Sequence, residues 1–418
     1  MRRAFNRPRG LLNLYLNVIV TDETVLYIWS FFLLLVWLVQ MADTNLDLKL
    51  LETLCNAFGP SGYEQEVQRI VRNHGAKFAD EVTYDRLGSV VFRRGSSGPK
   101  IMLAGHADEI GFVISDIDEK GFLKFQTVGG FFDQTLLARE VLIRPSAGSE
   151  KIVGIIGATP PHVLFPEDRA KVVVKDKMYI DIGCASSQEV KDLGIRVGDP
   201  AVPHATFRTM KRARSEKQEG TEGGTKKRTV NLGVAKAFDD RIGVFIALET
   251  LRRLSEQGIK HPNTVYFVST TQEEIGLRGA HTAAQMLLPD VGFSLDVDLS
   301  GDVPGCEDIV QKMGSGVSIS AGDSSMIPNP NLRRFVIETA EALGIKHQPA
   351  FLKAGGTDAG AIHMTGMGVP SLFVGVPTRH IHSHHAMLDL GDVENAVSLM
   401  MEVIKRLDDK RVKSFTEL

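Results

Sequence analysis

Residues 264–276 read TVYFVSTTQEEIG, and this stretch decides how the fold is interpreted. Its first half is a short apolar run, rich in β-branched and aromatic residues, which is typical of a strand buried inside a sheet. Two adjacent glutamates, Glu273 and Glu274, follow directly, and Gly276 comes two residues later. Because ligands of open α/β sheets bind at the carboxyl ends of the strands, we expect a functional acidic turn here.

Other apolar runs along the chain also end in acids or histidines. Residues 101–106 lead into His106 and Asp108, and the strand-like run 292–297 contains Asp296. Segments with apolar residues at helical spacing separate these runs. The alternation predicts an α/β fold with a doubly wound mixed sheet and flanking helices.

Residues 111–228 have a different texture. Up to about residue 202, short β-like runs are separated by Gly, Pro and Asp with little helical periodicity, which predicts a small β-barrel-like domain inserted into the α/β domain. Residues 209–229 have almost no apolar content and mixed charges, so we expect them to form a mobile surface loop that ends the insert. The α/β domain would then comprise residues 41–110 and 229–418.

The overall composition excludes several classes of protein. The 418 residues are 43% hydrophobic, and 48 Lys and Arg against 51 Asp and Glu leave a net charge of -3. This balance lacks the positive excess of a nucleic-acid-binding protein, so we expect no nucleic-acid partner. Three scattered cysteines are too few for a disulfide scaffold or a cysteine-rich zinc module.

The first 40 residues do not fit this composition. Residues 25–42 carry no charge and follow four arginines, so one interpretation of residues 1–40 is a membrane anchor. We favour a start site assigned too far upstream, because an amphipathic segment with Thr44 or Asn45 as helix cap begins after Met41. We therefore expect residues 1–40 to be absent from the mature protein, which we expect to be cytoplasmic and not bound to membranes.

Two more segments supply polar candidates. Asp239 and Asp240 precede an apolar helical segment, where adjacent acids also have an ordinary role as helix caps. Four histidines within residues 380–385 are a local enrichment that is typical of a metal or catalytic site. On an extended chain, alternation would place His380, His382 and His384 on one side.

These segments together predict a hydrolase with a metal centre. Zinc and cobalt accept the mixture of imidazole and carboxylate ligands, and one bridging carboxylate would build a two-metal site. One of two adjacent glutamates can bind metal while the other serves as general base. A buried Arg or Lys remains an alternative partner for Asp296.

The ordered set of motifs resembles the tetrahedral (TET) aminopeptidases, a family of cocatalytic metallopeptidases that includes the glutamyl aminopeptidases. The resemblance extends from Met41 to the C-terminus, and its motifs are AGHADEIGF (104–112), AFDDRIG (237–243), TTQEEIGLRGA (270–280), LDVD (295–298), GGTDAGAIH (355–363) and RHIHSHH (379–385). It implies a zinc-peptidase type of sheet domain and an aminopeptidase that hydrolyses N-terminal residues from peptides.

The resemblance also implies a role for each candidate residue. His106 and Asp296 would hold one divalent ion, and Glu274 and His382 the other, with Asp239 bridging both. Glu273 would be the general base, and Asp108 would orient His106. The two ions in each subunit would be zinc, with cobalt or manganese as alternatives. The inserted domain would mediate dimerisation, and the dimers would assemble into a dodecamer.

Other activities remain open at this point. A metal-dependent amino-acid deacylase would use the same ligands, and only its substrates would distinguish it. Some relatives carry the label endoglucanase, but glycosidases normally use two carboxylates without a metal, which leaves the histidine-rich segment without a role. A non-enzymatic binding protein would be expected to lack a ligand, and the motifs contain the full set together with the base.

Overall fold

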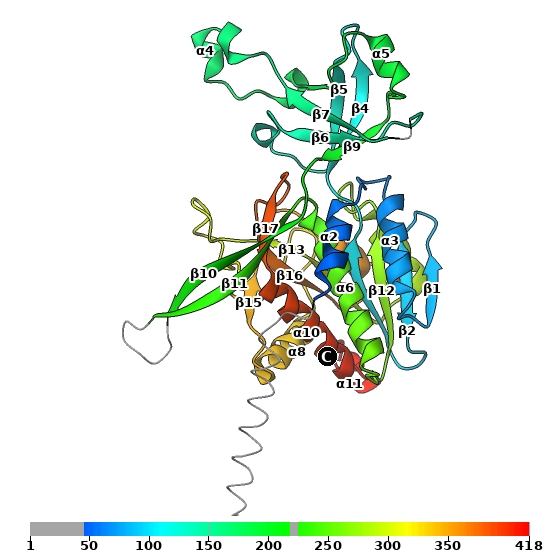
Figure 1. Cartoon of the computed structure of the whole chain (residues 1–418). Helices are drawn as coiled ribbons and strands as arrows, with labels where there is room; N and C mark the ends of the chain where they lie inside the picture. The colour runs from blue at the N-terminus through cyan, green and yellow to red at the C-terminus, as the bar shows by residue number, and fades with distance from the viewer. Residues whose placement is uncertain (1–45, 149, 218–224, 418) are drawn as a thin grey trace, which may run out of the picture. The chain divides into compact units, whose positions relative to one another are not determined.

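A large mixed sheet organises most of the chain (Figure 1). The computed structural model describes residues 46–148, 150–217 and 225–417, which belong to one unit beginning at Leu46. The strands of the sheet are β1 (Glu81–Tyr84), β2 (Val90–Arg94), β3 (Lys100–His106), β10 (Arg208–Lys217), β11 (Thr225–Ala235), β12 (Thr264–Thr270), β13 (Val291–Leu299), β14 (Val317–Ser320), β15 (His347–Ala350), β16 (Ser371–Arg379) and β17 (Ala386–Asp389). Their order is β1-β2-β12-β3-β13-β16-β17-β11-β10, with β14 and β15 joined to β16 outside this path.

The centre of the sheet is parallel, and its outer strands are antiparallel. Strand β3 lies between β12 and β13, and β13 pairs with β16, all in parallel. Strands β2, β17, β11 and β10 continue the sheet through antiparallel pairs. The four parallel strands therefore bring their carboxyl ends to one edge, as the sequence predicted for a ligand site.

Helices cover both faces of this sheet, and β3 shows why. Ile101 and Leu103 enter one apolar core, whereas Met102 and Ala104 enter another. Because successive strand residues point to opposite faces, a continuous apolar run must be covered on both sides. The larger core contains residues of α2 (Leu48–Asn56), α3 (Gln65–Gly75), α6 (Phe238–Glu256), α8 (Pro330–Ala342) and α10 (Leu390–Arg406), and is extended by residues near α11 (Asp409–Lys413). The second core contains residues of α7 (Arg278–Leu287) and α9 (Asp358–His363).

Six strands between β3 and β10 close a separate antiparallel barrel. They are β4 (Gly111–Ile117), β5 (Leu123–Val128), β6 (Glu140–Ile143), β7 (Ile152–Gly157), β8 (Tyr179–Asp181) and β9 (Pro200–Pro203), in the order β4-β5-β8-β7-β6-β9. Alternate residues such as Phe112, Ile114, Leu123 and Phe125 fill its interior. Its connections contain the short helices α4 (Pro166–Arg169) and α5 (Ser187–Asp192) and the 3-10 turns η1 (Asp133–Thr135), η2 (Pro161–Val163) and η3 (Lys175–Lys177). The predicted doubly wound α/β fold with an inserted barrel is confirmed.

The loop predicted over residues 209–229 is wrong. Strands β10 and β11 pair antiparallel over ten residue pairs, and β11 also pairs with β17. The hairpin is therefore part of the large sheet rather than of the barrel, and residues 218–224 between its strands lie outside the described residues. The signal that could have revealed it is the alternation of Val230, Leu232 and Val234, which are buried on one face. The charged residues of the other half obscured it.

The cap of helix α2 also differs from expectation. Helix α2 is capped by Asp47, whose side chain accepts a hydrogen bond from the Leu50 amide at 3.0 Å. The expected caps Thr44 and Asn45, and the whole apolar stretch 1–40, lie outside the described residues. In the part of the chain that the structure describes, no helix combines the length and apolar character needed to cross a bilayer.

Candidate metal centre

The predicted site residues meet at the carboxyl edge of the central strands. His106 ends β3 and lies opposite Thr270, the last residue of β12, directly before the turn that carries the two glutamates. Asp296 comes from β13, whose partner β16 leads into the segment with His382. Asp239 lies in the first turn of α6, where its backbone and that of Asp240 depart from helical geometry.

Asp239 lies between the two imidazoles. Its Oδ1 is 3.1 Å from His106 Nε2, and its Oδ2 is 3.1 Å from His382 Nε2. Each imidazole also has one glutamate beside it, because Glu273 Oε2 lies 3.7 Å from His106 Nε2 and Glu274 Oε2 lies 3.6 Å from His382 Nε2. Asp296 Oδ2 completes the group at 4.0 Å from His106 Nε2. The five expected ligands and the expected base therefore form one cluster.

The cluster contains more buried carboxylates than its two imidazoles can neutralise. Burial and the neighbouring acids raise the pKa of Glu273, Glu274 and Asp296 well above the usual carboxyl value. Burial alone would lower the pKa of His106, but Glu273 and the other acids around it outweigh burial and raise it. Burial likewise opposes the charged form of His382, yet Asp239 and Glu274 raise its pKa to about 9. Uncompensated buried acids at these distances are the electrostatic signature of a cation site.

The donor set fits divalent metal ions. Two groups have ligand atoms close enough to share an ion, namely His106, Asp239 and Glu274, and His106, Asp240 and Asp296. The Glu274 Oε1 atom is buried and has no hydrogen-bond partner. Among the described residues, no Lys or Arg forms a salt bridge with Asp296, and its recorded neighbours are other acids and His106. The alternative of a buried Arg or Lys partner is therefore not supported, whereas mixed imidazole and carboxylate ligands suit zinc and related ions.

Asp108 holds the glutamate turn as well as facing His106. Its Oδ1 lies 3.4 Å from His106 Nδ1 and accepts the Glu273 amide at 3.0 Å. Its Oδ2 accepts the Glu274 amide at 3.1 Å and the Ser61 hydroxyl at 2.6 Å. The ring nitrogen of His106 is also 3.1 Å from the Asp108 carbonyl, so backbone as well as carboxylate can orient the imidazole.

Asp240 is a site residue to which the sequence assigned only a capping role. Its side chain lies in the non-helical start of α6 and accepts the Gly243 amide at 2.8 Å. The same carboxylate accepts the His106 amide at 2.9 Å and so joins α6 to the end of β3. The close approach explains Gly105, because a Cβ there would lie 2.5 Å from the backbone of Gly243 and Val244. A Cβ on Gly243 would lie 2.0 Å from the Leu295 carbonyl of β13.

A fully buried ion group lies behind the cluster. Lys236 donates to both carboxylate oxygens of Glu109 at 2.6 and 2.7 Å, and Arg241 reaches the same carboxylate at 3.1 Å. Arg241 also donates to the carbonyls of Leu54, Ala57, Gly59 and Ala107, so one guanidinium joins α2, the end of β3 and the start of α6. The motif AFDDRIG thus supplies this arginine in addition to the acids.

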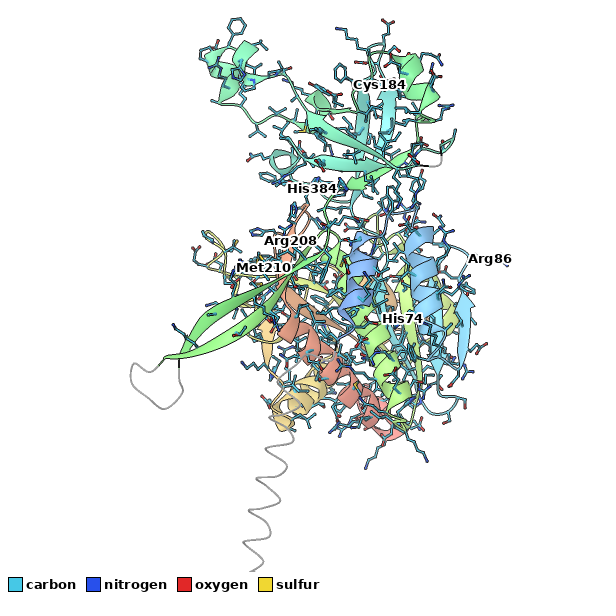
Figure 2. The ribbon with its side chains drawn as sticks, in the orientation of Figure 1. His74, Arg86, Cys184, Arg208, Met210 and His384 are labelled. Atoms are coloured by element: carbon cyan, nitrogen blue, oxygen red, sulfur yellow. The ribbon has the colours of Figure 1, made fainter. Side chains whose placement is uncertain are left out.

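The histidine-rich segment is not extended, and the expected alternation is wrong. His380 and His382 have left-handed φ angles of 59° and 56°, so the chain turns at both residues. His382 alone contacts Asp239, while His384 (labelled in Figure 2) places Nε2 3.0 Å from the Glu140 carbonyl of β6. Burial lowers the pKa of His384 to about 4, which keeps it neutral. His384 therefore links the segment to the barrel rather than joining the cluster.

A cavity opens beside His382. It has a volume of about 770 Å³ and is lined by both barrel and sheet residues. One wall comes from the segment between β5 and β6, which includes Phe131, Phe132 and Arg139, and the other comes from residues 380–385. A cavity of this size holds a small ligand or one end of a larger one.

Comparison with known proteins agrees with this geometry. Residues 88–217 and 222–399 match the M42 glutamyl aminopeptidase family. The putative aminopeptidase FrvX of Escherichia coli K12 is 35% identical over 374 residues, which cover 89% of this chain and 99% of that protein.

Solved structures are similar over the same region. A TET aminopeptidase from the marine sediment archaeon Thaumarchaeota archaeon SCGC AB-539-E09 shares 46% identity with a TM-score of 0.82, covering 88% of this chain and 99% of that one. The TET1 peptidase of Pyrococcus horikoshii, described as assembling into a tetrahedron or a large octahedral shell, shares 30% identity with a TM-score of 0.71, covering 86% and 99%. The resemblance inferred from the motifs is confirmed, and the chain belongs to the M42 glutamyl aminopeptidase family of peptidases.

Proposed function

We propose that this chain is an aminopeptidase that removes N-terminal residues from peptides with the help of two divalent metal ions. The observation that carries the proposal is the position of Asp239, 3.1 Å from each imidazole, with one glutamate beside each ring. A carboxylate between two such half-sites is the arrangement that a two-metal centre needs.

The ligands divide between two ions in this proposal. His106 and Asp296 would hold one ion, Glu274 and His382 would hold the other, and Asp239 would serve both. We propose zinc, with cobalt or manganese as alternatives that the same ligands accept. When bound, the ions supply Lewis acidity, which lowers the pKa of a water molecule and stabilises the negative charge that develops on the peptide carbonyl oxygen.

Glu273 is the proposed general base. Its amide is held by Asp108, and its carboxylate faces His106 without a lysine or arginine partner among the described residues. Burial raises the pKa of Glu273 above its usual carboxyl value, which makes its carboxylate a stronger proton acceptor. Glu273 takes the proton of the attacking water and returns it to the leaving amine, while Asp108 orients His106.

The decisive experiment is metal analysis of the purified protein together with a substrate panel. The panel contains aminoacyl substrates and short peptides, N-acyl amino acids and cellulose, each assayed before and after removal of metal by a chelator. We expect about two ions per chain and hydrolysis of free N-termini that the chelator abolishes and added metal restores. Turnover of N-acyl amino acids alone would contradict the proposal in favour of a deacylase, and chelator-resistant cellulose hydrolysis would favour a glycosidase.

We also propose that the inserted barrel is the surface of self-association. Large apolar side chains are exposed on its connections, with Val163 and Phe165 both 72% exposed and Phe132 61% exposed. Exposed apolar groups of this kind mark protein–protein contacts. The relatives known as TET1 assemble into dodecamers and larger shells, and we propose dimers that assemble to a dodecamer here. A cytoplasmic location remains part of the same proposal.

A further inference from the structure

The loop between α2 and α3 contacts the turn that carries the two glutamates. Its sequence, Gly59-Pro60-Ser61-Gly62, reads as a helix stop, and Tyr63 and Glu64 complete the connection to α3. Pro60 forms a β-bridge with Glu109, and the Glu109 amide donates to the Gly59 carbonyl at 3.0 Å. The loop is therefore fixed against the end of β3, directly beside the proposed metal centre.

The glutamate turn depends on side chains for its amide partners. The amides of Gln272, Glu273 and Glu274 donate to carboxylates rather than to main-chain carbonyls. Asp108 accepts two of them, and Glu64 Oε1 accepts the third, from Gln272, at 3.1 Å. Gln272 has a left-handed φ of 55°, a conformation that a residue with a side chain adopts only when its surroundings impose it. Glu64 supplies the hydrogen bond at that residue.

Glu64 is not used by the helix that it precedes. It occupies the N-cap position of α3, but its side chain makes no capping hydrogen bond to that helix. Its Oε1 instead accepts the Gly62 amide at 2.8 Å and the Gln272 amide. The side chain is buried, with only 3% of the residue exposed. An ordinary capping role therefore does not account for this buried carboxylate.

Ser61 acts on the same turn through Asp108. Its hydroxyl donates to Asp108 Oδ2 at 2.6 Å, and the residue is 6% exposed. That oxygen also accepts the Glu274 amide, so the hydroxyl fixes the carboxylate that holds the turn. One loop thus contacts the turn directly through Glu64 and indirectly through Ser61.

We propose that Glu64 and Ser61 are positioning residues that fix the backbone of residues 272–274 and thereby the direction of the Glu273 carboxylate. This inference rests on the proposed function, in which Glu273 transfers the proton. A general base acts only within hydrogen-bond reach of its proton, and a displacement of about 1 Å can cost roughly 100-fold in rate. In this role Glu64 and Ser61 contact neither the substrate nor the side chains of the proposed metal ligands.

The test compares Glu64→Met with Glu64→Gln in the full-length protein. Methionine fills the buried space but cannot accept the Gln272 amide, whereas glutamine keeps an acceptor oxygen. We expect Glu64→Met to lower kcat by about 10-fold to 100-fold with little change in KM, and Glu64→Gln to restore most of the loss. Ser61→Ala should lower kcat by a smaller factor. Arg69→Ala, at an exposed position of α3 five residues along the chain, is the control and should behave as wild type.

Two readouts other than activity separate positioning from a general structural defect. Hydrogen–deuterium exchange should increase in peptides covering residues 271–277 in Glu64→Met, but not in the barrel or in α10. Metal content should remain that of wild type. The positioning role would be overturned if Glu64→Met had the wild-type kcat. It would also be overturned if kcat fell together with stability and bound metal, and either result would leave the proposed function intact. A wild-type protein without chelator-sensitive aminopeptidase activity would instead overturn the proposed function and this inference with it.

Discussion

The sheet edge and the barrel treat charged and apolar side chains in opposite ways. At the carboxyl edge of the sheet, His106, Asp108 and Asp240 are almost completely buried, and so is the Lys236–Glu109 ion pair behind them. The barrel buries an apolar interior and leaves large apolar side chains such as Phe165 exposed on its connections.

This difference separates the region of the proposed chemistry from the region of the proposed association. Buried charge destabilises a protein unless it is paired, so its concentration at one edge indicates a site where ions and protons are handled. Exposed apolar surface, in the same way, indicates where chains contact one another. Four predictions test this division, beginning with the largest expected effect.

Removing the proposed base should have the largest effect. Glu273→Gln keeps the size of the side chain but cannot accept a proton, and we expect kcat to fall by about 10²- to 10⁴-fold. Bound metal should stay at the wild-type level, because Glu273 is not one of the proposed ligands. Glu167→Gln, at an exposed position in the barrel, should leave kcat unchanged. An active Glu273→Gln variant on aminoacyl substrates would show that the proton is transferred by another group.

Breaking the buried ion group should mainly reduce stability. Glu109→Gln leaves Lys236 and Arg241 without their carboxylate, and removing one partner of a buried pair costs about 3–5 kcal/mol in the free energy of unfolding. The barrel's exposed pair of Lys171 and Asp168, 2.8 Å apart, provides the contrast. Asp168→Asn should cost less than about 1 kcal/mol. Chemical denaturation measures both values, and equal losses would contradict the division between the two regions.

Changing the barrel surface should alter assembly and not catalysis. Phe165→Glu introduces charge at a 72% exposed apolar position, and we expect the association constant to fall by roughly 10-fold or more. Light scattering after size-exclusion chromatography measures the assembly, while kcat per chain should stay near the wild-type value. Met367→Glu, on the fully exposed loop after α9, serves as the comparison outside the barrel. Dissociation by Met367→Glu alone would assign the association surface to the sheet domain.

The smallest effect concerns pH and the metal-free protein. The acids around His382 raise its pKa to about 9, from an ordinary value near 6.5. A raised histidine pKa contributes stability that is fully present below pH 6.5 and is lost as the pH rises through 9. The melting temperature of the metal-free protein should therefore fall between pH 6 and pH 9.5, and His382→Ala should reduce that fall. The effect is small because the His382 side chain is 40% exposed and screened by solvent. An unchanged slope in His382→Ala would contradict this assignment.

Much of the fold could be predicted from strand and helix patterns. The apolar run 264–270 coincides with β12, and the run 101–106 lies within β3, because strands buried on both faces leave a continuous apolar signal. The β10–β11 hairpin was not predicted because its many charged residues hide the alternation of Val230 and Leu232, which are buried in one small core. The pairing of β11 with β17, which joins the hairpin to the sheet, is not visible in the local sequence. Local pattern is weak where a strand is stabilised by its neighbours.

The sequence predicted the residues of the candidate metal centre but not the residues that hold them in position. Residue type and position in the predicted elements marked the segments that contain His106, Asp239 and Glu274, and the family resemblance assigned the individual ligands. The structure brings these three residues together. The contacts of Ser61 and Glu64 could not be foreseen, because their partners lie far along the chain, at Asp108 47 residues later and at Gln272 208 residues later. The turns at His380 and His382 depend on backbone angles that histidine seldom adopts.

The pairing of β4 with β9 has a consequence for how the catalytic sheet assembles. Phe112 lies opposite Ala201, so the folded barrel returns its two ends to neighbouring positions. His106 and Asp239, 133 residues apart in sequence, therefore do not meet by closing a random loop of that length. Once the barrel has folded, the conformational entropy of residues 111–203 is already spent, and the chain that remains before Asp239 contains strands β10 and β11. A folded insert therefore lowers the entropic cost of joining the two halves of the sheet.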